Sequence, residues 1–222
     1  MQKLRLEQML LRVGIFLLGL IVLALGITLN TKTGLGVSPI ISVAYCITHI
    51  TGILLGTMTF LCYLLYILLQ WILLGKKFEK RQFLQILVSM VTSFFIGLFD
   101  TVIPDAQSVP QQVLLLVLAI VLTGIGAAVT VGMHLIANPA DALAYVLGEK
   151  LKKGFGFGKN VFDVTCIAVS AVIGLIFTGH LIGIGIGTVC SMIFIGRVVA
   201  LCSRPVSDVY GRVCCPDTMG EE

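Results

Sequence analysis

The 222-residue sequence contains little charge. Asp, Glu, Lys and Arg together make up 12% of it, against the roughly 25% that is usual for soluble domains. Apolar residues make up 58% and the mean hydropathy is +1.07. This balance excludes a soluble globular fold, because several apolar runs reach the ~20 residues that a helix needs to cross about 30 Å of hydrocarbon. We expect an all-α integral membrane protein.

Signatures of enzymes and of metal sites are also missing. The sequence holds no HExxH motif, no phosphate-loop signature and no Ser/His/Asp order. Cys214 and Cys215 lack the second ligand pair that zinc needs, and the scattered cysteines form no disulfide framework. An intramembrane enzyme would need a reactive group such as Cys166 or His134 beside a second polar side chain, and no spacing supports one. We expect no enzyme, no cofactor, no metal and no nucleic-acid partner.

One stretch of the chain occurs twice, at an offset of one hundred residues. The copies are 26–45, GITLNTKTGLGVSPIISVAY, and 126–145, GAAVTVGMHLIANPADALAY. Each copy ends a long apolar run, breaks at a polar corner before a proline, and restarts as a short helical segment. Five positions are identical: Gly26 and Gly126, Leu35 and Leu135, Pro39 and Pro139, Ala44 and Ala144, Tyr45 and Tyr145. A duplicated interruption of apolar sequence is typical of a transport site.

Hydropathy and loop charge together predict the topology. Two segments, 36–50 and 137–151, are too short or too polar to cross hydrocarbon. With six spans and both termini in the cytoplasm, Lys32 alone among the 15 basic residues falls outside, as expected because positive loops stay in the cytoplasm. The predicted spans are 12–31, 53–74, 83–103, 112–133, 160–178 and 181–201.

The prediction is therefore six transmembrane helices arranged as two inverted three-helix repeats. Each repeat carries a short broken or re-entrant segment after its first helix. Eight spans, with both short segments crossing, would make the repeats parallel, but the length and charge of those segments argue against this alternative. The divisions are a first membrane repeat at 1–103, an external linker at 104–111, a second membrane repeat at 112–204 and a cytoplasmic tail at 205–222.

Polar residues gather at the two corners and are the candidate substrate-binding residues. A helix that begins inside lipid has unpaired N–H groups, which can bind an anion or a carboxylate. Ser38 and Asn138 are also natural N-caps, and Asp141 also suits the helix dipole from the first turn. Asp141 and His134 are candidates for proton coupling. The full set is Asn30, Thr33, Ser38 and Ser42 at the first corner, and His134, Asn138 and Asp141 at the second.

These features predict a secondary carrier for a small polar or anionic solute, with its site between the two broken segments near mid-membrane. The alternative is a non-transporting membrane protein that anchors or regulates a partner through its basic cytoplasmic loops. A homodimer is a further prediction, because Gly179, Gly183 and Gly187 make two small-xxx-small steps that let helices approach closely.

The first corner, ALGITLNTKTGLGVSP, and the ANPAD sequence of the second resemble the YitT/YczE group of bacterial multi-pass membrane proteins. The GLGVSP stretch is the most specific part of this resemblance. The resemblance implies a bacterial cytoplasmic membrane and a transporter-like role. It implies no substrate and no catalytic residues.

Overall fold

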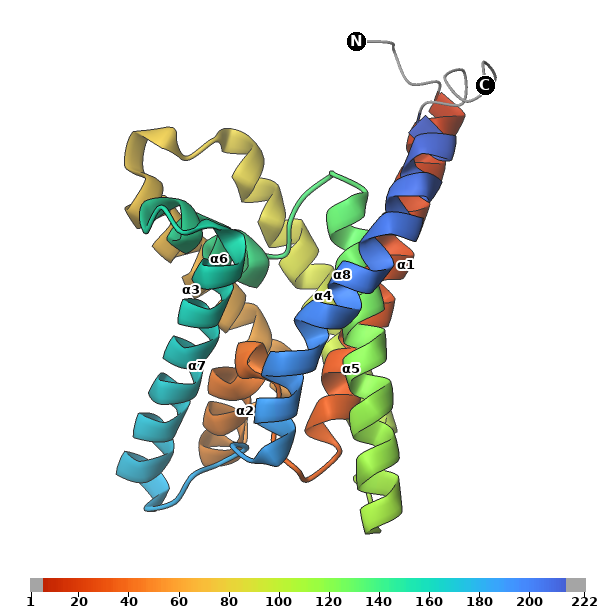
Figure 1. Ribbon diagram of the computed structural model, residues 1–222. Helices are drawn as coiled ribbons and strands as arrows, with labels where there is room; N and C mark the ends of the chain where they lie inside the picture. Colours follow the sequence, from red (N-terminus) through yellow and green to blue (C-terminus); the bar gives the residue numbers. More distant parts are fainter. Residues whose placement is uncertain (1–5, 215–222) are drawn as a thin grey trace.

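The computed structural model describes residues 6–214, and these residues contain helices and turns but no strand. Six helices are long and apolar enough to cross a membrane, as the sequence predicts. Two short 3-10 segments, Gly75–Lys77 and Lys80–Leu84, connect α3 to α4. The α-helices are α1 (Leu6–Thr31), α2 (Pro39–Thr51), α3 (Leu55–Leu74), α4 (Gln85–Val102), α5 (Val109–Gly132), α6 (Pro139–Lys150), α7 (Gly154–Thr178) and α8 (Ile186–Cys214) (Figure 1).

The last span differs from its predicted bounds at both ends. It begins at Ile186 rather than 181, because the glycine-rich stretch before it is a loop in which Gly179 and Gly183 have φ angles of 77° and 69°. It continues as helix to Cys214 and so includes residues 205–214, which the prediction assigned to a tail. The remainder of that tail, 215–222, lies outside the described residues.

The short helices α2 and α6 begin at the two predicted prolines. Proline suits the first turn of a helix because its missing N–H needs no partner there. Gly52, with a φ of 73°, ends α2. At 1.5 Å per residue, 13 and 12 residues give α2 and α6 lengths of about 20 Å or less, so neither alone crosses hydrocarbon.

Helices α2 and α6 both pack between α3 and α7. They lie toward opposite ends of the bundle (Figure 1). The basic-loop end, defined by the connections 75–84 and 150–154, carries α6. The other end, which we call the Lys32 end, carries α2 and the Lys32 ammonium, 2.8 Å from an Asp100 carboxylate oxygen and 3.7 Å from one of Asp105.

Buried polar side chains on the long helices hold the short ones in place. The Gln70 amide nitrogen on α3 donates to the Pro139 carbonyl at 3.1 Å, and Gln70 and Gln85 exchange two amide hydrogen bonds of 3.1 and 3.0 Å. One hundred residues later, Ser170 on α7 donates to the carbonyl of Ser42 at 3.1 Å. A buried polar group is costly to leave unpaired, so these bonds fix where each short helix begins or runs.

Helices α1 and α5 approach so closely that only glycine fits at two repeat-related positions. A Cβ atom at Gly26 would lie 2.4 Å from the backbone nitrogen of Thr123. A Cβ atom at Gly126 would lie 2.4 Å from the backbone nitrogen of Leu23. The first pair of identical residues in the duplication therefore makes two reciprocal close contacts between α1 and α5.

Candidate functional site

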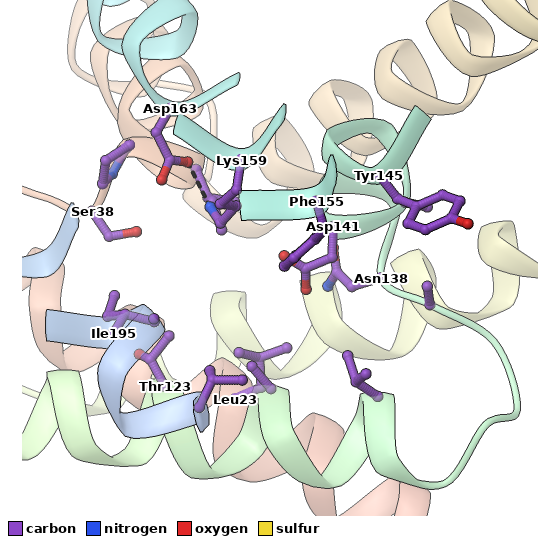
Figure 2. A pocket seen from close by; sticks show the side chains of 18 of the residues that line it. Leu23, Ser38, Thr123, Asn138, Asp141, Tyr145, Phe155, Lys159, Asp163 and Ile195 are labelled. Atoms are coloured by element: carbon purple, nitrogen blue, oxygen red, sulfur yellow. Dashed lines mark hydrogen bonds and ion pairs between the residues drawn. The ribbon is translucent and has the colours of Figure 1, made fainter. Parts of the chain in front are cut away.

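A cavity of about 870 Å³ opens between the two short helices (Figure 2). The N-termini of α2 and α6 both reach it, and the first turns of α7 and the middle of α8 form further walls. Helices α1 and α5 contribute mainly apolar side chains. Among the lining residues are Leu23, Ile27, Ser38, Tyr63, Asn138, Asp141, Lys159, Asp163, Ser191 and Ile195.

Three of the seven predicted site residues line this cavity: Ser38, Asn138 and Asp141. They come from corners one hundred residues apart in the chain, and the fold brings them to one cavity. The cavity is thus lined by residues from both short segments, while a solute site there stays a prediction.

The other residues of the first corner lie behind the cavity wall. The Thr33 hydroxyl donates to the Asn30 carbonyl at 2.9 Å, and the Ser42 hydroxyl donates to the Pro39 carbonyl at 2.8 Å. The Asn30 side chain donates to the hydroxyl of Ser191, a lining residue, at 2.9 Å. Asn30 therefore supports the wall, while Thr33 and Ser42 stabilise the corner backbone.

His134 lies outside the cavity lining. Its φ is 48°, and its ring packs edge-on against Tyr210 with centroids 5.1 Å apart. Its carbonyl oxygen accepts a hydrogen bond of 2.9 Å from the Arg12 guanidinium. The structure thus brings Asp141, but not the His134 side chain, into the cavity.

The partly shielded charges of the cavity form a cluster of two carboxylates and one ammonium. Lys159 and Asp163, one helical turn apart on α7, form an ion pair at 2.5 Å, and Asp163 is 4% exposed. Asp141 is half-buried on α6, outside the six long helices. Burial raises the pKa of Asp141 above its ordinary value, Lys159 lowers it in part, and Asp163 raises it again. We call Asp141, Lys159 and Asp163 the acidic cluster.

The two helix N-termini that face the cavity are capped differently. The Asn138 side-chain oxygen accepts a hydrogen bond of 3.1 Å from the backbone N–H of Ala140. Ser38 makes no such bond to α2, and its hydroxyl, on a side chain 2% exposed, has no hydrogen-bond partner among the described residues. The Tyr63 hydroxyl also lacks a partner of good geometry, although the Asn138 side chain lies beside it. The cavity lining therefore holds two unused hydroxyl donors, Ser38 at the start of α2 and Tyr63 beside the start of α6.

The two corners are held by different contacts. At the Lys32 end, the Val37 N–H donates to the Gly183 carbonyl at 2.7 Å and the Gly187 N–H donates to the Leu35 carbonyl at 2.8 Å. A Cβ atom at Gly185 would lie 2.4 Å from the Leu35 oxygen, so the loops touch backbone to backbone.

At the basic-loop end, long side chains reach the second corner. The Arg12 guanidinium donates to the Met133 carbonyl at 2.7 Å, and the Arg81 guanidinium donates to the Leu135 carbonyl at 2.6 Å. Arg81 itself lines the cavity, together with exposed Glu79. The cavity therefore reaches toward the basic-loop end, while the corner at the Lys32 end is packed shut.

The glycines predicted to form a dimer contact have structural roles within one chain. Gly179 ends α7 with a φ of 77°. A Cβ atom at Gly183 would meet the Tyr45 ring at 2.6 Å, and one at Gly187 would lie 2.7 Å from the Gly36 oxygen. A homodimer through these residues stays a prediction.

The site residues predicted from the sequence do not include Lys159, Asp163 or Tyr63. Lys159 and Asp163 are four residues apart, and this spacing is a signal in the sequence, because such a pair shares one helix face. Tyr63 lies within an apolar run and gave no signal. Among residues 6–214, no three His, Cys, Asp or Glu side chains are grouped to hold a metal ion.

Comparison with known proteins identifies the family. A family model described as "Family of unknown function (DUF6198)" matches residues 10–204. The chain belongs to this family. It is also similar to a Bacillus subtilis (strain 168) protein named "Uncharacterized protein YyaS", with 25% identity over 189 residues that cover 82% of this chain and 87% of the relative. No solved structure matches this DUF6198 chain. The YitT/YczE group is not the family that the comparison names.

Proposed function

We propose that this DUF6198 chain is a secondary carrier for a small solute with a polar or anionic group. The solute site is the cavity between α2 and α6. The observation that carries the proposal is that both corners of the duplication reach one cavity, which extends toward one end of the bundle while the corner at the other end is packed shut. Alternation of a site between two ends is the defining property of a carrier.

The paths of the helices support two inverted repeats. In Figure 1, α1 runs from the basic-loop end to the Lys32 end, and α5, its counterpart in the second copy, runs back. Helices α3 and α7 are opposed in the same way, as are α4 and α8. In this proposal α2 and α6 are re-entrant segments that enter from opposite ends and begin near the centre. Inverted repeats allow the closed and open ends to exchange roles by a movement of one half against the other.

The distribution of charge supports an orientation. Basic residues gather at the basic-loop end, where Lys76, Lys77, Lys80 and Arg81 lie between α3 and α4. Positive loops stay in the cytoplasm, so the cavity opens to the cytoplasm and both termini lie there. The relative in Bacillus subtilis and the GLGVSP motif support a bacterial cytoplasmic membrane and a kinship with the YitT/YczE group.

Uptake into proteoliposomes tests the carrier. The purified chain is reconstituted and given labelled monocarboxylates, amines and apolar amino acids in turn, with protein-free liposomes as the baseline. We expect saturable uptake of at least one class. Ser38→Ala and Asp141→Asn should each lower that uptake by about ten-fold or more, because a hydrogen bond to a charged group contributes about 1.5–3 kcal/mol.

Glu149→Gln is the matched control, because it removes one exposed carboxylate of α6 that does not line the cavity. Its uptake should equal that of the unmodified chain. Uptake at the protein-free baseline for every class would contradict the carrier. That result would favour the alternative, a protein that anchors or regulates a partner through its basic loops.

A further inference from the structure

The α2 end of the cavity has the properties of a carboxylate site. The first N–H groups of a helix have no carbonyl partner within the helix and carry partial positive charge. At α6, the Asn138 side chain already satisfies one of them. At α2, Ser38 leaves its own hydroxyl unpartnered, although the side chain is 2% exposed and lines the cavity. A buried donor without a partner is costly, and an anionic group of a solute would supply that partner.

The acidic cluster lacks a second positive charge. The Lys159 ammonium forms its ion pair with an Asp163 carboxylate oxygen at 2.5 Å, and Asp141 forms no ion pair among the described residues. The cluster therefore holds two carboxylates and only one ammonium. The other charged lining residues, Glu79, Arg81 and Arg197, are exposed. Arg81 is engaged with the second corner, and the Arg197 guanidinium lies 5.4 Å from the centroid of the Phe194 ring. An ammonium group of a solute would balance the shielded carboxylate.

The wall of the cavity opposite these polar groups is mainly apolar (Figure 2). Helices α1 and α5 contribute Leu23, Ile27 and Ala127, and α8 contributes Met192 and Ile195. A volume of about 870 Å³ is in the range of pockets for organic ligands, of roughly 300–1,000 Å³. An inorganic anion would leave this surface uncovered and would face the carboxylates of the acidic cluster, so it does not suit the cavity.

We infer that the cavity binds a zwitterion with an apolar body, such as an apolar amino acid. The carboxylate of the solute lies at Ser38 and the α2 N-terminus, its ammonium lies at Asp141, and its apolar part contacts α1, α5 and α8. This assignment rests on the proposed carrier function and deepens it by naming the solute class.

Three probes that share one apolar body test the assignment. Calorimetric titration of the purified full chain compares L-phenylalanine with 3-phenylpropanoate, which lacks the ammonium, and with 2-phenylethylamine, which lacks the carboxylate. The zwitterion should bind at least about ten-fold more tightly than either, because each missing charge leaves a shielded group of the cavity unpaired.

Two variants and one control separate the ends of the solute. Asp141→Asn should remove the preference for L-phenylalanine over 3-phenylpropanoate. Ser38→Ala should reduce the preference for L-phenylalanine over 2-phenylethylamine. It should leave the preference for L-phenylalanine over 3-phenylpropanoate in place. Glu149→Gln should keep the pattern of the unmodified chain, and a circular-dichroism melt of each variant establishes that it is folded.

Equal affinity for all three probes, or binding of none of them, overturns the zwitterion assignment. An Asp141→Asn variant that keeps the full preference overturns it as well. None of these results tests the proposed carrier function, which the uptake assay tests separately. Uptake of an amine or a monocarboxylate in that assay would support a carrier with a different solute.

Discussion

Replacing Gly126 by leucine should strongly destabilise the helical bundle. A Cβ atom at this position would lie 2.4 Å from the backbone nitrogen and 2.6 Å from the Cα of Leu23, so α1 itself would have to move away. Backbone cannot give way as a flexible side chain does. Inserting bulk into a well-packed core costs about 1–3 kcal/mol and sometimes more, and we expect the upper part of this range or beyond.

Thermal unfolding of the purified protein in detergent measures the effect, and Gly26→Leu should be similarly damaging, because a Cβ atom there would lie 2.4 Å from the backbone of Thr123. Gly14→Leu is the control, since a Cβ atom at Gly14 on α1 meets nothing within 4 Å. Leucine is also a better helix former than glycine, so the control should unfold at an unchanged or higher temperature. Equal melting of Gly126→Leu and Gly14→Leu would disprove the close α1–α5 contact.

Replacing Gly185 by valine should open the Lys32 end of the bundle. The Cβ atom of valine would lie 2.4 Å from the carbonyl oxygen of Leu35, so the corner and the loop before α8 could no longer touch. If this overpacking costs the closed arrangement about 1.4–3 kcal/mol, the ratio of closed to open molecules falls by about ten-fold or more. The cavity would then be reached from the end that is now shut.

A reporter cysteine at Ala142, a lining residue next to Asp141, measures this opening. In a background without native cysteines, an impermeant thiol reagent applied at the Lys32 end should label Ala142→Cys faster when Gly185→Val is present. Gly14→Val is the control, because a Cβ atom at Gly14 on α1 meets nothing within 4 Å and Gly14 does not line the cavity. Equal labelling of the two double variants would exclude the glycine contact as the seal.

Much of the fold was readable from the sequence because lipid imposes strong rules. The long apolar runs predict the six helices, and the prolines at 39 and 139 predict where α2 and α6 begin. The matched Gly26 and Gly126 indicated a duplication, but their mutual contacts with α5 and α1 require the structure, since sequence spacing does not tell which helix faces which.

The site was less predictable, because its residues come from helices spread over the whole chain, from α1 to α8. Ser38, Asn138 and Asp141 were found by their place at the corners, and all three line the cavity. His134 also lies at a corner, yet its positive φ and the contact of its ring with Tyr210 leave it outside the lining. The four-residue spacing of Gly183 and Gly187 matches the small-xxx-small pattern of helix dimers. In the structure, both residues instead contact the backbone of the first corner within the same chain.

Labelling of the reporter cysteine at Ala142 from each end, in the cysteine-free background without a further substitution, tests the proposed carrier function most directly. Cysteines at Lys76 and at Ser108 serve as controls for the basic-loop end and the Lys32 end, since both positions are exposed. We predict that Ala142→Cys reacts rapidly from the basic-loop end and, more slowly, from the Lys32 end as the two halves exchange their open and closed arrangements. Labelling from the basic-loop end alone, with or without a transported solute, would contradict alternating access.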